Sequence, residues 1–122
     1  MNRNELGKHG EQLAASFLEA SGWTVIDRNW HCAEGELDIV AISEDAGEST
    51  LAFCEVKTRT GLGYGSPLES ITDLKVRRLR HLTARWLLEH PITATHIRLD
   101  AIGVLLVPGR EPQIHHLSGI GR

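Results

Sequence analysis

Two segments of the chain, residues 36–43 (ELDIVAIS) and 51–58 (LAFCEVKT), alternate like β-strands and carry their charge at one end. Because alternate side chains of a strand share a face, an antiparallel pairing can set Asp38 opposite Glu55. The apolar partners in that register are Val40 with Phe53 and Ile42 with Leu51. A slip of one residue would mismatch both the charged and the apolar sets. The alternation therefore predicts one hairpin register, with a long turn near residues 44–49 and two carboxylates at the open end.

The open end of this hairpin has the composition of a metal site. Asp38 and Glu55 repel each other unless a cation lies between them. Mg²⁺ suits this position because it accepts one or two carboxylates and keeps several waters, and the backbone carbonyl of Val56 would add another oxygen. Lys57 shares the face of Glu55 and is placed to hold an attacking water or to stabilise charge on a phosphate oxygen. The alternative that the spacing leaves open is a surface cluster of Asp, Lys and Glu in salt bridges.

Apolar periodicity, caps and turn residues predict the other elements. These are a helix from about Asn4 to Gly22, a strand over 23–29, a helix capped by Thr72 that ends near His90, a strand over 97–107 and a strand over 113–117. Glycines at 61, 63 and 65 with Pro67 mark a loop. The order α-β-β-β-α-β-β predicts an α/β (α+β) fold with a mixed central sheet flanked by helices. We expect residues 1–122 to form a single domain with a flexible end.

The formal net charge of −3 conceals an uneven distribution of charge. Residues 1–56 carry three basic and eleven acidic side chains, and residues 57–122 carry ten basic and five acidic ones. The two halves would either neutralise each other or set a carboxylate cluster beside a cationic surface. No signal peptide and no membrane-spanning run is visible, and Cys32 and Cys54 form no disulfide framework. We therefore expect a cytoplasmic protein with reduced thiols and no membrane partner.

Basic residues on one face of the second predicted helix are candidates for binding nucleic acid. They are Lys75, Arg78 and Arg85. Such a face is either a solvated surface or a set of contacts to phosphates, which supply affinity without reading sequence. Arg59, two residues beyond Lys57, is the best single candidate for a phosphate contact. Arg98 and Asp100 share a strand face, and we expect them to pair with each other or with Arg59 in a structural role.

The ordered motifs of the chain resemble a known nuclease core. GELD (35–38) and EVK (55–57) on adjacent strands are similar to the PD-(D/E)xK nucleases, whose first helix adds a Glu, here Glu11. The wider set resembles the YraN-like family, an uncharacterised bacterial group with a predicted endonuclease fold. Its motifs here are G-x-x-G-E, R-N-W, G-E-L-D-I-V, F-C-E-V-K-T-R, K-x-x-R-L and R-L-D. The likeness extends from about Gly7 to Leu117 and implies a restriction-endonuclease-like core.

This resemblance implies roles for the matching positions. Asp38 and Glu55 would be ligands of Mg²⁺ or Mn²⁺, and Lys57 would position or activate the attacking water. Glu11 would lie near the metal, either as a ligand through water or as a partner of Lys57. The first hypothesis is a metal-dependent endonuclease acting on DNA, possible substrates being branched or processed DNA, and a homodimer is implied by small junction-cleaving relatives. The alternatives are a non-catalytic nucleic-acid-binding module that keeps the fold, and a structural protein whose two charged halves meet across a dimer.

Overall fold

The computed structural model describes residues 1–61 and 66–121. Within them the elements are α1 (Arg3–Ala20), β1 (Thr24–Cys32), β2 (Gly35–Asp45), β3 (Glu48–Arg59), the 3-10 helix η1 (Pro67–Ser70), α2 (Asp73–Glu89), β4 (His96–Leu105) and β5 (Gln113–Leu117). The predicted order α-β-β-β-α-β-β and the α+β class are confirmed. Residues 62–65 of the predicted glycine-rich loop and residue 122 of the predicted flexible end lie outside the described residues. No described helix combines the length and the apolar character needed to cross a membrane.

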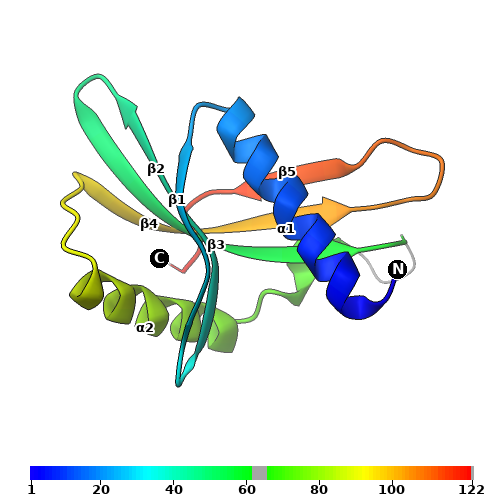
Figure 1. The fold of residues 1–122 in the computed structure, drawn as a ribbon, viewed down its shortest axis with the longest axis horizontal. Helices are drawn as coiled ribbons and strands as arrows, with labels where there is room; N and C mark the ends of the chain where they lie inside the picture. The colour runs from blue at the N-terminus through cyan, green and yellow to red at the C-terminus, as the bar shows by residue number, and fades with distance from the viewer. Residues whose placement is uncertain (62–65, 122) are drawn as a thin grey trace.

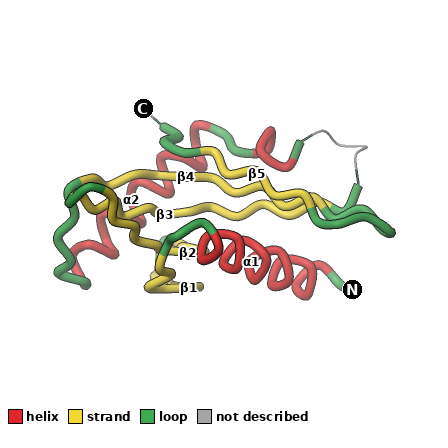
Figure 2. Tube along the Cα trace, turned by 90° about the horizontal axis from the view of Figure 1, so that it is seen from above, coloured by secondary structure: helices red, strands yellow, loops and turns green. Residues whose placement is uncertain are grey.

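The strands form one mixed sheet in the order β1-β2-β3-β4-β5. Neighbouring strands are antiparallel except β3 and β4, which are parallel. A parallel pair needs a crossover connection, and α2 lies within the one between β3 and β4. α1 covers one face of the sheet, while α2 and η1 lie on the other, as Figure 1 and Figure 2 show. The result is three layers, with the sheet between helices.

Each face of the sheet packs its own core. On one face Ala14, Ala15 and Leu18 of α1 meet Ile39, Ala41, Ala52, Cys54, Ile102 and Val104. On the other face Leu79, Leu82 and Trp86 of α2 meet Leu37, Val40, Leu51, Phe53 and Leu99. Consecutive residues of β2 and β3 thus alternate between two buried faces, as the central strands of a covered sheet do. Cys54 is fully buried in the first of these cores.

The hairpin of β2 and β3 has the predicted register but a different turn. Val40 pairs with Phe53 and Ile42 with Leu51, as expected. The predicted long turn is wrong because pairing continues to Asp45 and Glu48. Only two residues remain between the strands, and both have positive φ angles, 52° at position 46 and 81° at position 47. Two-residue turns of this kind match the twist of the flanking strands and favour glycine in the second position, which sequence alternation alone does not reveal.

The apolar spacing of the sequence predicts that Leu74, Leu79, Leu82 and Trp86 form the buried stripe of α2, and the structure differs from this prediction at one position. Leu79, Leu82 and Trp86 are buried as predicted, but Leu74 is 61% exposed. Val76 packs against the core in its place. Val76 precedes Leu79 by three residues and therefore lies on the same helical stripe, whereas a residue five positions before Leu79 faces away from it.

α1 approaches the sheet closely where it carries Gly10. A Cβ atom at position 10 would lie 1.8 Å from the side-chain oxygen of Thr58, far inside van der Waals contact. Because glycine has no Cβ atom, Gly10 permits this close approach. At Gly7, one turn earlier, a Cβ atom would have no described heavy atom within 4 Å apart from its local backbone. Gly10 therefore sets the distance between α1 and β3, and Gly7 does not.

Replacing these two glycines with alanine should shift stability in opposite directions. Gly10→Ala is expected to lower the free energy of unfolding by about 1–3 kcal/mol, because the helix must move away from Thr58. Gly7→Ala meets no obstacle and should raise that free energy by up to about 1 kcal/mol, because alanine favours the helix. Urea denaturation of both variants checks the pair. Equal shifts of the same sign would contradict the close contact at Thr58.

Candidate functional site in the fork of the sheet

β2 and β3 separate at the open end of their hairpin, the end opposite the turn. The last described pair of this ladder is Ile39 with Cys54. Beyond it β2 stays paired with β1 as far as Gly35, while β3 stays paired with β4 as far as Arg59. Each strand follows its other neighbour, so the two strands separate into a fork, visible near the centre of Figure 1. The fork opens immediately beyond the apolar part of the hairpin, where the charged residues begin.

Asp38 occupies the root of the fork. Its Oδ2 accepts a hydrogen bond of 2.8 Å from the backbone N–H of Val56. The carboxylate thereby satisfies an N–H group of β3 where the ladder with β2 has ended. Asp38 is only 9% exposed although it carries no described salt bridge. The hydrogen bond from Val56 thus positions this carboxyl group at the point where the two strands separate.

Burial raises the pKa values of the carboxyl groups around the fork. Burial, followed by the charge of Glu55, raises the pKa of Asp38 to about 8 despite the opposing hydrogen bond from Val56. Burial also raises the pKa of Glu55, which the charges of Lys75 and Lys57 partly oppose. Burial and the charge of Glu36 raise the pKa of Glu11. Three acidic side chains from α1, β2 and β3 are thus partly buried close together, where ionisation is opposed.

A cleft of about 670 Å³ opens from the fork toward α1. It is lined by Arg3, Leu6, Gly7, Glu11, Glu36, Asp38, Glu55, Val56, Lys57, Thr58, Arg59, Thr60 and Gly61. The structure therefore brings together every predicted catalytic and metal-binding residue and Arg59. Arg3 was missed by the sequence reasoning. Its signal was the four-residue spacing of Arg3, Gly7 and Glu11, which places them on one face of a helix.

Two polar atoms of cleft residues are buried without partners among the described residues. They are Oε1 of Glu11 and Nε of Arg59. Buried polar atoms in folded proteins normally have hydrogen-bond partners, and exceptions concentrate where a ligand, water or ion belongs. Lys57 lies in the same cleft, where burial, with the charges of Lys75 and Arg59, lowers its pKa. The cleft thus contains an acidic and a basic side chain, each with a buried polar atom that has no hydrogen-bond partner among the described residues.

A smaller hollow, of about 230 Å³, lies on the α2 side of the fork. Its lining is Gly35, Glu36, Asp38, Glu55, Lys75, Arg78, Leu79 and Leu82. Lys75 and Arg78, predicted to bind nucleic acid, therefore face the same carboxylates as the cleft does. We call this space the α2-side hollow and the larger one the α1-side cleft. Glu36, Asp38 and Glu55 line both of them.

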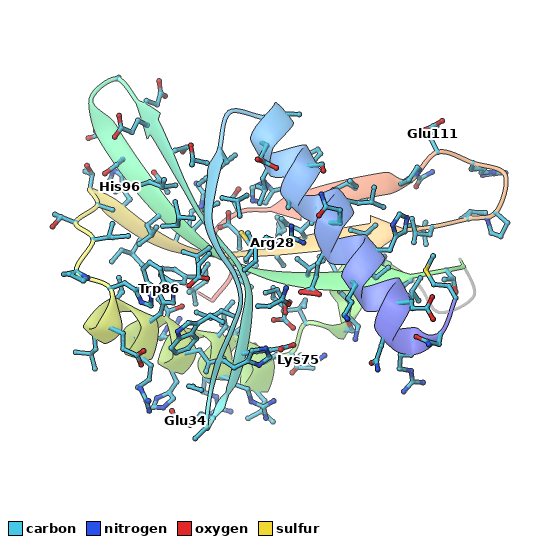
Figure 3. All side chains as sticks on the ribbon, viewed as in Figure 1. Arg28, Glu34, Lys75, Trp86, His96 and Glu111 are labelled. Carbon is cyan, nitrogen blue, oxygen red and sulfur yellow. The ribbon has the colours of Figure 1, made fainter. Side chains whose placement is uncertain are left out.

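Arg85, the third basic residue predicted on α2, is not brought to the fork. Its guanidinium lies 2.6 Å from Glu34 and 3.9 Å from Glu89. His81 also contacts Glu34. Figure 3 shows Glu34 at the tip of the β1–β2 hairpin, separated from Lys75 along α2. These contacts hold the hairpin tip against α2, so Arg85 has a structural role in the part of the chain described.

Arg98 and Asp100 form the structural pair that the sequence predicted. Nε and Nη2 of Arg98 donate to the Asp100 carboxylate at 2.8 and 2.9 Å. Asp100 also accepts from Nε2 of His116 at 2.7 Å and from the backbone of Gly119 at 3.0 Å. Arg98, rather than Arg59, is the partner of Asp100. This network ties β4 to β5 and to the C-terminal segment, away from the fork.

The donor set at the fork fits a hard divalent cation that keeps much of its water. Within residues 1–61 and 66–121, no three His, Cys, Asp or Glu side chains are grouped as a complete metal site. Mg²⁺ does not need one, since it is commonly held by one or two carboxylates together with waters and substrate phosphates. Asp38 and Glu55 supply two carboxylates whose mutual repulsion a cation would relieve. The partnerless oxygen of Glu11 would suit a metal-bound water.

The three-layer fold with a carboxylate cluster in a forked sheet defines an α+β protein whose site suits metal-assisted chemistry. A family model described as "Uncharacterised protein family UPF0102" matches residues 10–104. A UPF0102 protein of Renibacterium salmoninarum is 50% identical over 117 residues, covering 96% of each chain. A UPF0102 protein of Mycobacterium tuberculosis is 46% identical over 124 residues, covering 99% of this chain and 95% of the other. The chain belongs to the UPF0102 family, the YraN-like group that the motifs indicated.

Proposed function

We propose that this protein is a metal-dependent endonuclease that hydrolyses phosphodiester bonds in DNA with Mg²⁺ or Mn²⁺. The observation that carries the proposal is the fork itself. It buries Asp38 beside Glu55 and sets Lys57 in the same cleft. A surface salt-bridge cluster, the alternative from the sequence, would be exposed and internally paired. Asp38 is neither.

Each residue of the cleft has a defined part in the proposed reaction. Asp38 and Glu55 would hold the cation, with the carbonyl of Val56 as a further ligand. The bound cation would supply Lewis-acid polarisation of the phosphate and a lowered pKa of the attacking water. Lys57 would donate to that water or to a phosphate oxygen, where charge develops in the transition state. Glu11 would orient water through its partnerless oxygen.

Cations on both sides of the fork support a polyanionic substrate. Arg3, Lys57 and Arg59 line the α1-side cleft, and Lys75 and Arg78 line the α2-side hollow. Lysine and arginine side chains that neutralise phosphates release counterions from the nucleic acid and so supply affinity. Branched or processed DNA is the proposed form of the substrate, a homodimer the proposed assembly, and the cytoplasm the proposed location. These points come from the resemblance of the sequence to small nucleases.

DNA cleavage assays test the proposal. Supercoiled plasmid and synthetic four-way and flapped duplexes are incubated with the protein and Mn²⁺ or Mg²⁺. Cleavage is expected to require the cation, to fall to background in Asp38→Asn, and to fall by about 10²–10³-fold in Lys57→Met. Asp45→Asn is the matched control, because it makes the same chemical change at the exposed end of the same strand. Cleavage that survives both Asp38→Asn and Lys57→Met would overturn the mechanism.

The same assays distinguish the binding module from the enzyme. A non-catalytic module would bind these DNAs through its basic side chains and leave every one of them intact. Its affinity would fall steeply with salt, because phosphate contacts release counterions. Binding that is unchanged by divalent cations, together with intact DNA, would replace the nuclease proposal with this alternative.

A further inference from the structure

We propose that the α2-side hollow is a second phosphate-binding subsite, which takes the phosphate next to the scissile one and accepts it only when a divalent cation is bound at Asp38 and Glu55. This inference rests on the proposed function for the position of the cation and of the scissile phosphate. It adds an anion site on the opposite side of the fork, and it makes the binding of phosphate there depend on the binding of the cation. The inference is based on the hollow, on the side chains of Lys75 and Arg78 that line it, and on its acidic wall, which consists of Glu36, Asp38 and Glu55.

The hollow has the cationic side chains that a phosphate requires. Lys75 and Arg78 lie three residues apart on α2 and therefore on one face of the helix, and both line the hollow. Thr72 caps the helix by accepting from the backbone N–H of Lys75 at 3.2 Å, which fixes where the first turn begins. Leu79 and Leu82 close the hollow on the same helix. The site is thus built on a capped, packed helix.

The charged groups of Lys75 and Arg78 are not engaged in salt bridges with other described residues. Among the described residues, neither Lys75 nor Arg78 has a carboxylate within salt-bridge distance, whereas Arg85 on the same helix has two. Lys75 is nevertheless close enough to act on Glu55, since its charge is the largest influence that opposes the effect of burial on the Glu55 pKa. Lys75 and Arg78 therefore face the carboxyl groups of the fork without forming salt bridges to them, and this leaves room for an anion.

The acidic wall makes the binding of an anion in the hollow depend on a bound divalent cation. Glu36, Asp38 and Glu55 line the hollow as well as the cleft, so a phosphate held by Lys75 would lie close to like charge. Like charges a few ångströms apart repel more strongly near a protein surface than in bulk water, because the effective dielectric is lower there. A divalent cation at Asp38 and Glu55 would cancel this repulsion. Because linkage is reciprocal, a phosphate in the hollow would strengthen cation binding by the same factor.

The first test measures ligand binding without any cleavage. The probes are thymidine 3′,5′-bisphosphate, which carries two phosphates at nucleic-acid spacing, and thymidine 5′-monophosphate, titrated calorimetrically with and without Mn²⁺. Mn²⁺ should tighten bisphosphate binding by about 10- to 100-fold, and the bisphosphate should bind more tightly than the monophosphate. In Lys75→Met/Arg78→Met this advantage of the bisphosphate should vanish. Arg77→Met, an exposed change on the same helix outside the hollow, should keep it.

A metal-free variant separates the subsite from cation binding itself. Asp38→Asn/Glu55→Gln neutralises the two proposed metal ligands without a bound cation and leaves Glu36 as the one remaining carboxyl group of the hollow. Bisphosphate should then bind without Mn²⁺, and binding should still depend on Lys75 and Arg78. The subsite is overturned if this variant gains no affinity for the bisphosphate or if Mn²⁺ does not tighten bisphosphate binding to the wild type. It is also overturned if Lys75→Met/Arg78→Met still binds the bisphosphate more tightly than the monophosphate.

The two proposals fail in different ways. Intact DNA in every cleavage assay, together with the expected bisphosphate results, would remove hydrolysis and leave the subsite standing. Unchanged cleavage by Lys75→Met/Arg78→Met, together with an unchanged bisphosphate advantage, would remove the subsite and leave hydrolysis standing.

Discussion

Asp38→Asn is expected to raise the free energy of unfolding at pH 7 by about 3–4 kcal/mol, and under the proposed function it would also abolish cation-dependent cleavage. The wild-type fold holds this carboxyl group in a place where ionisation is opposed by burial and by the charge of Glu55. Asparagine keeps an oxygen acceptor for the N–H of Val56 and carries no charge. The substitution therefore removes the electrostatic cost and keeps the hydrogen bond that positions the side chain.

The pH dependence of this effect has a definite sign. Asp38 has a pKa of about 8 in the folded protein and about 4 in the unfolded chain. An acid whose folded pKa is raised loses stability as pH rises from the unfolded to the folded value, at about 1.4 kcal/mol per pH unit. Wild type and Asp38→Asn should therefore differ little at pH 4, diverge up to pH 8 and differ by a constant amount above it.

Urea denaturation from pH 4 to 9 measures this divergence. Asp45→Asn serves as the control and should show no such trend, because its carboxylate is exposed at the hairpin turn. Mn²⁺ should stabilise the wild type and leave Asp38→Asn nearly unaffected, because a ligand that binds only the folded protein stabilises it. A variant less stable than the wild type at pH 7, or a gap independent of pH, would contradict the electrostatic strain assigned to the fork.

The expected gain in stability on losing Asp38 bears on function. A residue whose charge weakens the fold has no structural reason to be charged. Strongly perturbed ionisable groups gather at functional sites, where activity requires charge that folding alone would not favour. The stability measurement is thus a test of the site that needs no knowledge of the substrate.

The sequence predicted the central hairpin well because its information is local. Alternation at Val40, Ile42, Leu51 and Phe53 admits one register, and that register places Asp38 near Glu55 before any tertiary contact is known. The fork itself was not predictable in the same way. It arises because β1 and β4 pair with β2 and β3 beyond the hairpin's last rung, and such pairings join segments distant in the chain.

Partners distant in sequence also decided which basic residues reach the site. Lys75, Arg78 and Arg85 look equivalent on the helix, but the tip of the β1–β2 hairpin places Glu34 beside Arg85 alone. Leu74 was predicted to be buried because it is apolar, but it is exposed because its angle on the helix lies outside the buried stripe. Arg3 was overlooked because its helical spacing to Glu11 gains meaning only once α1 is known to cross the fork.

The same chemical change at Asp100 should have the opposite effect. Asp100 is fully buried, and burial by itself raises its pKa. The hydrogen bonds from His116, Arg98 and Gly119 outweigh this and hold the pKa of Asp100 below its usual range. Asparagine offers one acceptor atom in place of two and turns an amide N–H toward groups that are all donors. Asp100→Asn is expected to lower the free energy of unfolding by about 3 kcal/mol, as breaking a buried ion pair does.

The two aspartates can be separated by one pH series. An acid whose folded pKa is lowered contributes stability that is fully present above its unfolded value and is lost as pH falls through the folded value. The deficit of Asp100→Asn should therefore be constant from pH 5 to 8, where the gain of Asp38→Asn grows with pH. Glu111→Gln, an exposed change in the β4–β5 connection (Figure 3), is the control. If Asp100→Asn were neutral, or if its deficit grew with pH as the Asp38→Asn gain does, the contrast between a carboxylate surrounded by donors and one surrounded by carboxylates would be lost.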